Sequence, residues 1–102
     1  MHPQIEIRYF DGCPHWEQTR HLVEEVLAAE GIEADVRLTA IADPEIAERL
    51  AFRGSPTVLV DGVDPWGNPA APVGLSCRVY RTGDSFSGTP PRDELRAAIL
   101  GT

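Results

Sequence analysis

Residues 9 to 16 contain the side chains most capable of chemistry in this chain, with Cys13 followed by Pro14, His15 and Trp16. The residues before Cys13 alternate as in a strand, and those after it have helical spacing, so we expect Cys13 where a strand ends and a helix begins. Pro14 suits the first helical position there. A helix N-terminus and a nearby imidazolium both favour the thiolate, which is the nucleophilic form of cysteine. This pattern predicts a reactive cysteine.

One feature opposes that interpretation. Asp11 places a carboxylate near Cys13 and disfavours a second negative charge. A small buried cysteine at a helix start is the alternative, and Trp16 either shields the thiol or packs in the core. We expect an exposed His15 that tunes Cys13, which should then alkylate quickly near neutral pH, whereas Cys77 should not.

Length and composition restrict the class of protein. The chain has 102 residues, 42% of them hydrophobic, and a formal net charge of −7. These values predict one globular domain and argue against nucleic acid or an anionic membrane as a partner. We find no run of about 18 apolar residues and no export signal at the N-terminus, so a cytoplasmic protein without a membrane partner is expected. Two cysteines are too few for a disulfide scaffold or a four-cysteine zinc site, and no metal site is predicted.

The periodicity predicts an α/β fold in the order β-α-β-α-β-β-α. The whole of residues 1–102 forms the domain, with a Pro/Gly-rich insertion at 63–76. A helix joins the first two strands, which should therefore be parallel with a right-handed crossover. We expect one four-stranded mixed sheet with helices on both faces. The strands are expected over 4–9, 32–38, 55–62 and 77–82, and the later helices begin near 43–45 and 89–91.

The element order, Cys13 at the first strand-to-helix turn and the segment 53–62 (RGSPTVLVDG) together resemble the thioredoxin/glutaredoxin superfamily over most of the chain. The resemblance implies a cis peptide bond at Pro56, next to Cys13. It also implies that the backbone at Ser55 pairs with a substrate chain as an added strand. The implied activity is thiol–disulfide exchange, with a protein disulfide or a low-molecular-weight thiol such as glutathione as partner and no bound cofactor.

The sequence departs from the family pattern in its active motif. Cys13-Pro14-His15 looks like the start of the Cys-Pro-His-Cys motif, but Trp16 occupies the fourth position. The mechanism implied is therefore that of single-cysteine glutaredoxins, in which another thiol releases the mixed disulfide. Gly83 and Asp84 lie where glutaredoxins bind the amino end of glutathione, and they are candidates for binding a thiol ligand.

Cys77 is the candidate second thiol. If the strands at 55–62 and 77–82 form a hairpin, Cys77 lies a strand length from the active end, ~17–20 Å away, beyond the reach of a disulfide. Direct pairing with Cys13 then requires the insertion to fold back. A buried structural cysteine and an intermolecular or metal role are the alternatives.

Two other functions compete with the redox interpretation. In one, Cys13 and Cys77, together with Asp11, bind a soft metal or act as an organomercurial lyase-like site. In the other, the domain is a non-catalytic thioredoxin-fold binding module. The sequence does not specify an oligomeric state.

Overall fold

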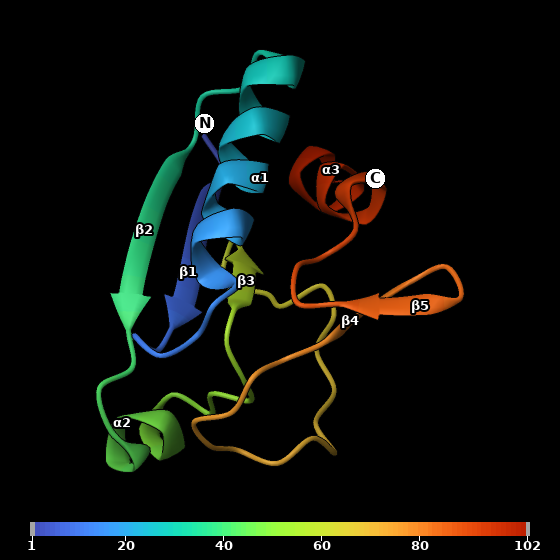
Figure 1. The fold of residues 1–102 in the computed structure, drawn as a ribbon. Helices are drawn as coiled ribbons and strands as arrows, with labels where there is room; N and C mark the ends of the chain where they lie inside the picture. Colours follow the sequence, from blue (N-terminus) through green and yellow to red (C-terminus); the bar gives the residue numbers. More distant parts are fainter. Residues whose placement is uncertain (1, 102) are drawn as a thin grey trace.

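The computed structural model describes residues 2–101 as a small mixed α/β structure with a three-stranded sheet, a separate two-stranded sheet and three helices (Figure 1). No helix in this part of the chain is long and apolar enough to cross a membrane. The elements are β1 (Gln4–Tyr9), α1 (Trp16–Glu30), β2 (Asp35–Ala40), α2 (Pro44–Arg49), β3 (Thr57–Val60), β4 (Tyr80–Thr82), β5 (Ser85–Ser87) and α3 (Arg92–Leu100).

The larger sheet has the strand order β2-β1-β3. β1 and β2 are parallel, with Ile7 opposite Leu38, as expected for two strands joined by a helix. β3 is antiparallel to β1 and places Val58 opposite Ile7. The carboxyl end of β1 and the amino end of β3 therefore lie at the same end of the sheet, where the turn carrying Cys13 begins.

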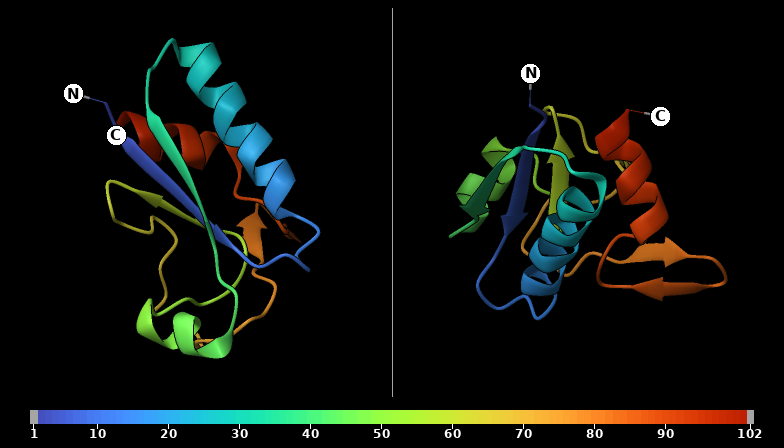
Figure 2. Two further views of the ribbon diagram at one scale, coloured as in Figure 1. Left: turned by 90° about the vertical axis from the view of Figure 1, so that its left-hand side faces the viewer. Right: turned by 90° about the horizontal axis from the view of Figure 1, so that it is seen from above.

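α1 and α3 cover one face of this sheet, while α2 lies on the other side (Figures 1 and 2). Alternate residues of β1 and β3 point to the covered face, where they meet the apolar stripes of the two helices. Leu95 and Ile99 of α3 are buried there. The core consists of Ile5, Ile7, Val23, Val26, Leu27, Val58, Val60, Leu95 and Ile99.

α2 begins as predicted, with Asp43 as the N-cap and Pro44 in its first turn. The Asp43 carboxylate accepts a hydrogen bond from the backbone N–H of Ile46 at 2.9 Å. A second apolar cluster, made by Ile41, Ala47 and Phe52, holds this short helix at the carboxyl end of β1 and β2.

The predicted four-stranded sheet differs from the observed arrangement. β4 starts at Tyr80 rather than at Cys77, and it pairs with β5 in a separate hairpin instead of joining β3. The predicted second strand also begins later, at Asp35, and its side chains Val36 and Leu38 remain 38% and 37% exposed. β2 is an edge strand, so one side of it has no neighbour to bury those side chains.

Candidate functional site

Cys13 lies in the turn between β1 and α1, and its backbone N–H donates to the carbonyl oxygen of Phe10 at 3.0 Å. The residue is buried, with 5% of its surface exposed. α1 starts only at Trp16, so Pro14 precedes the helix and does not occupy its first position as predicted. The proline restricts the turn ahead of the helix rather than its first turn.

The two residues after Pro14 pack against neighbouring elements. His15 is the N-cap of α1, and its carbonyl accepts from the backbone N–H and the hydroxyl of Thr19, each at 3.1 Å. Its ring lies against Gly88, where a Cβ atom would overlap it. Trp16 stacks on Tyr9, with the ring centroids 4.1 Å apart. Both side chains are half-buried, so His15 is less exposed than predicted.

The Ser55–Pro56 peptide bond is cis, as the resemblance implied. Phe10 connects this dipeptide to Cys13, because its N–H donates to the Ser55 hydroxyl oxygen at 3.4 Å while its carbonyl accepts from Cys13. The Tyr80 hydroxyl donates to the Pro56 carbonyl at 2.5 Å. The structure therefore joins the turn before α1 to the start of β3 through these hydrogen bonds.

The Tyr80 side chain, which donates to Pro56, is 2% exposed. Burial raises the pKa of the Tyr80 phenol, Arg78 lowers it, and the charges of Asp64 and Cys13 raise it further. The phenol is therefore a neutral hydrogen-bond donor at physiological pH, and the Arg78 guanidinium carbon lies 4.8 Å from the centroid of its ring.

Cys77 is not a strand length away from this site, and that prediction is wrong. It forms an isolated parallel bridge with Ser55, in which the Ser55 N–H donates to Ser76 and the Arg78 N–H donates to Ser55, both at 2.8 Å. Paired backbones lie about 4.8 Å apart, so Cys77 is beside the dipeptide that contacts the Cys13 turn. The insertion at 63–76 folds back across the sheet and brings Cys77 to the start of β3, whereas the prediction assumed a hairpin.

The same bridge changes the expected role of Ser55. Its backbone N–H and carbonyl are the groups that the resemblance assigned to an added substrate strand, and the chain's own residues Ser76 and Arg78 already pair with both. An external strand would have to displace residues 76–78 before it could pair at this position.

The two cysteines differ in accessibility. Both are free thiols, Cys13 buried and Cys77 exposed. From exposure alone, Cys77 should be alkylated faster than Cys13, which is the reverse of the order predicted from the sequence. Within residues 2–101, no three His, Cys, Asp or Glu side chains gather in a group able to hold a metal ion.

Gly83 and Asp84, the candidates for binding a thiol ligand, form the exposed turn between β4 and β5. Gly83 has a positive φ of 63°, as the tight turn requires. Figure 1 shows this hairpin extending away from the start of α1, with its turn at the far end.

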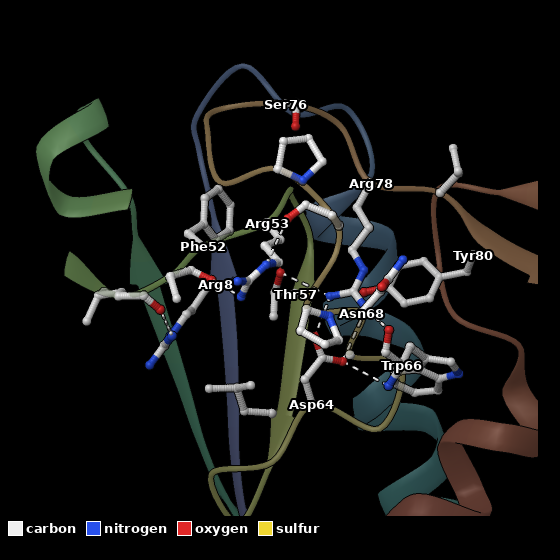
Figure 3. Close-up of a pocket in the computed structure, with 18 of the residues that line it drawn as sticks. Arg8, Phe52, Arg53, Thr57, Asp64, Trp66, Asn68, Ser76, Arg78 and Tyr80 are labelled. Atoms are coloured by element: carbon white, nitrogen blue, oxygen red, sulfur yellow. Dashed lines mark hydrogen bonds and ion pairs between the residues drawn. The ribbon is translucent and has the colours of Figure 1, made fainter. Parts of the chain in front are cut away.

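Sequence reasoning missed a cleft of about 840 Å³ on the open face of the sheet, between β3, the end of α2 and the insertion (Figure 3). Arg78 organises its wall. This side chain forms a two-pronged ion pair with Asp64 at 2.6 and 3.2 Å, and it also donates to the Trp66 carbonyl at 2.6 Å and to the Thr57 hydroxyl at 3.3 Å. Arg78 and Asp64 are 12% and 21% exposed, so this pair is largely shielded from water.

The sequence contains the residues of this network but no signal that pairs them. Arg78 follows directly after Cys77, and the segment 64–67 (Asp-Pro-Trp-Gly) stands out within the insertion. Only the folded chain shows that Arg78 and Asp64 meet, because fourteen positions of irregular backbone separate them.

Comparison with known proteins gave no matching family model and no curated protein of similar sequence. The function is therefore inferred from the geometry of these residues.

Proposed function

We propose that the protein is a thioredoxin-like thiol–disulfide oxidoreductase that acts through Cys13 by a single-cysteine mechanism. The observation that supports this best is the link from Cys13 through Phe10 to Ser55 and Pro56. It joins a thiol in the turn before a helix to the start of a neighbouring strand, where a substrate disulfide would align once residues 76–78 have moved from Ser55. The bridged segment 76–78 takes the place of a fourth strand in this proposal.

The proposed reaction has two exchanges. The Cys13 thiolate attacks one sulfur of a disulfide R–S–S–R′, the S–S bond breaks, and R′–S⁻ leaves as Cys13–S–S–R forms. A second thiolate R″–S⁻ then attacks the sulfur of R, which releases R–S–S–R″ and regenerates the Cys13 thiolate. No other oxidant or metal is required. Because Cys13 is 5% exposed, we expect small disulfides to react faster than protein disulfides.

The experiment compares the Cys13→Ser and Cys77→Ser variants in a turnover assay with bis(2-hydroxyethyl) disulfide and glutathione, followed by mass spectrometry of the trapped mixed disulfide. We expect Cys13→Ser to lose activity by at least about 100-fold and Cys77→Ser to stay within about threefold of the parent. Turnover that persists in Cys13→Ser would overturn the proposal. Absence of turnover in the parent would favour a non-catalytic binding module.

The Ser55–Cys77 bridge favours one second candidate, the binding of a soft metal ion by two thiolates. The bridge places Cys77 beside the dipeptide that contacts the Cys13 turn. The predicted long distance between the two cysteines therefore no longer argues against their binding one metal ion. Titration with mercuric ion tests it, with the thiolate-to-metal absorbance as readout. This candidate requires weaker binding in both Cys→Ser variants, and it fails if either variant binds mercury as tightly as the parent.

A further inference from the structure

The open-face cleft is a separate site from the Cys13 turn, and a ligand bound there requires no redox function of the protein. Cys13 is not among the residues that line the cleft, whereas Cys77 is. The lining comes from the polar face of β1 and β3, the end of α2, and the insertion (Figure 3).

The cleft concentrates positive charge in an acidic protein. Four of the nine basic residues of the chain line it, namely Arg8, Arg53, Arg78 and Arg81, although the net charge of the chain is −7. Asp64 is the one acidic residue among the described residues lining the cleft, and Arg78 neutralises it. The local field therefore attracts anions.

Arg53 and Arg8 carry donor groups that the protein does not use. Arg53 donates from Nε to the Ala71 carbonyl at 2.9 Å and from Nη1 to the Ala51 carbonyl at 3.3 Å. Within residues 2–101 it has no carboxylate partner. Arg8 donates from Nε to Glu6 at 2.9 Å and from Nη1 to the Leu50 carbonyl at 3.1 Å. In both side chains Nη2 makes no hydrogen bond to another described residue, so each retains donors for a ligand.

The two guanidinium groups donate to neighbouring backbone carbonyls. Their acceptors are the carbonyls of Leu50 and Ala51, which are consecutive residues with Cα atoms about 3.8 Å apart. Ala51 adopts a left-handed conformation with φ of 52°, which is uncommon for a residue other than glycine. Such local strain is typical of segments held in place for function. Figure 3 shows Arg8 and Arg53 entering the cleft from the same side.

Part of the remaining wall is apolar, and Thr57, Asn68 and Ser76 add polar groups to it. Leu50, Phe52, Leu59, Pro69 and Pro72 contribute to the lining. A volume of about 840 Å³ is within the usual range for small-molecule sites and far exceeds the size of an inorganic anion. The planar donor fork of arginine matches a carboxylate.

We propose that this cleft binds a small organic carboxylate, with Arg53 and Arg8 contacting the carboxylate and the aliphatic and aromatic wall contacting an apolar body. Because Arg8 already pairs with Glu6, Arg53 supplies the larger share of the attraction.

The test is a titration of the full chain with benzoate. Binding is measured by NMR from the shifts of the amide and indole resonances of ¹⁵N-labelled protein. Benzamide has the same shape without the charge, and inorganic phosphate has the charge without the apolar body. We expect benzoate to shift the resonances of Trp66, Gly67 and Arg78, with binding at least about tenfold tighter than that of benzamide. Equal binding of benzoate and benzamide, or saturation by phosphate without benzoate binding, would overturn the proposal.

Substitutions of Arg53 test whether this side chain contacts the carboxylate of benzoate. Arg53→Gln should weaken benzoate binding by about tenfold, and Arg53→Lys should restore part of it by restoring the charge. Arg92→Gln is the matched control, because Arg92 lies on α3 and pairs with Glu25, and neither residue lines the cleft. If Arg53→Gln binds benzoate as tightly as Arg92→Gln does, the assignment is wrong. The dispersion of the amide spectrum shows whether each variant is folded.

Cys77 supplies an independent reporter, because its exposed thiol lines the cleft. In a Cys13→Ser background, we expect the anionic reagent 2-sulfonatoethyl methanethiosulfonate to modify Cys77 faster than the cationic 2-(trimethylammonium)ethyl reagent. Arg53→Gln should reduce that ratio several-fold, and benzoate should slow both reactions. A ratio that does not respond to Arg53→Gln or to added salt would contradict an anion-attracting cleft.

Discussion

The two faces of the β2-β1-β3 sheet are held in different ways, although successive residues of the same strands make them. On the covered face, Ile5, Ile7 and Val58 are 1%, 0% and 0% exposed and pack against α1 and α3. On the open face, Glu6 and Arg8 form ion pairs. Apolar burial needs only complementary shape, while the polar face needs specific partners from a distant segment. The covered face is therefore the stable platform, and the open face is the part of the sheet available for recognition.

The largest loss in the free energy of unfolding should come from a substitution on the covered face. Ile7→Ala removes a fully buried side chain at the centre of the sheet, and we expect a loss of about 3–4 kcal/mol in the free energy of unfolding. Leu38→Ala is the matched control, because Leu38 lies opposite Ile7 but is 37% exposed. Chemical denaturation measures both. Equal losses for the two variants would contradict the distinction between a central and an edge strand.

On the open face, Arg78→Ala should cost about 2–3 kcal/mol, since it leaves Asp64 and the Trp66 carbonyl without their partner in a shielded site. Arg78→Lys should recover only part of the loss, because one ammonium group cannot reproduce the two-pronged contact. Denaturation midpoints measure the loss, and a double-mutant cycle with Asp64→Asn isolates the pair. A loss below about 0.5 kcal/mol would show that the network does not hold the insertion.

A substitution at Gly54 tests the close packing of residues 54–55 against residues 77–78, which form the Ser55–Cys77 bridge. Its φ is +123°, and a Cβ atom there would lie 2.9 Å from the Cβ of Arg78, so Gly54→Ala should cost about 2 kcal/mol. Gly62→Ala is the control, because Gly62 also has a positive φ, +82°, but nothing within 4 Å of an added Cβ. The control should lose only about 1 kcal/mol, from backbone strain alone. Thermal unfolding compares them, and the interpretation fails if the order is reversed.

The smallest predicted effect is a pH dependence on the open face. Burial raises the pKa of Glu6, but hydrogen bonds from Arg8 and Thr39 and the charges of Arg8 and Arg37 outweigh it, so the pKa lies below the ordinary value. The stabilisation is therefore complete above the unfolded pKa of about 4.3 and is lost as the pH falls through the lower folded value.

We expect Glu6→Gln to cost about 1 kcal/mol at pH 7, with the difference from the parent shrinking below about pH 4. Urea denaturation across pH measures it, and Glu33→Gln, at a side chain 86% exposed, serves as the control. A difference between Glu6→Gln and the parent that grows as the pH falls would have the wrong sign.

Local patterns predicted a good part of the structure. The alternation around Ile5 and Ile7 located β1, and the helical stripe after Cys13 located α1. Asp43 and Pro44 located the start of α2. These signals depend on a few neighbouring residues, so they can be read without the rest of the chain. Boundaries were less accurate, as at Pro14 and at the start of β2, because packing decides the last turn or residue of an element.

The candidate site was predicted in part. Cys13, Ser55 and Pro56 are brought together through Phe10. Cys77 was placed at the wrong end of the sheet, because the prediction took the shortest connection between strands, while the insertion crosses over and pairs in parallel with Ser55. The donors of Arg8 and Arg53 could not be foreseen, because their acceptors are carbonyls whose positions depend on the end of α2.

By itself, the sequence determined the helices, the parallel pair of strands and the thiol at a strand-to-helix turn, because each depends on residue types within one or two turns or strands. Only the tertiary structure decided which thiol is accessible, what pairs with Ser55, and where the arginines gather. Those outcomes depend on contacts between residues far apart in the chain, and such contacts form only when the insertion has packed against the open face of the sheet.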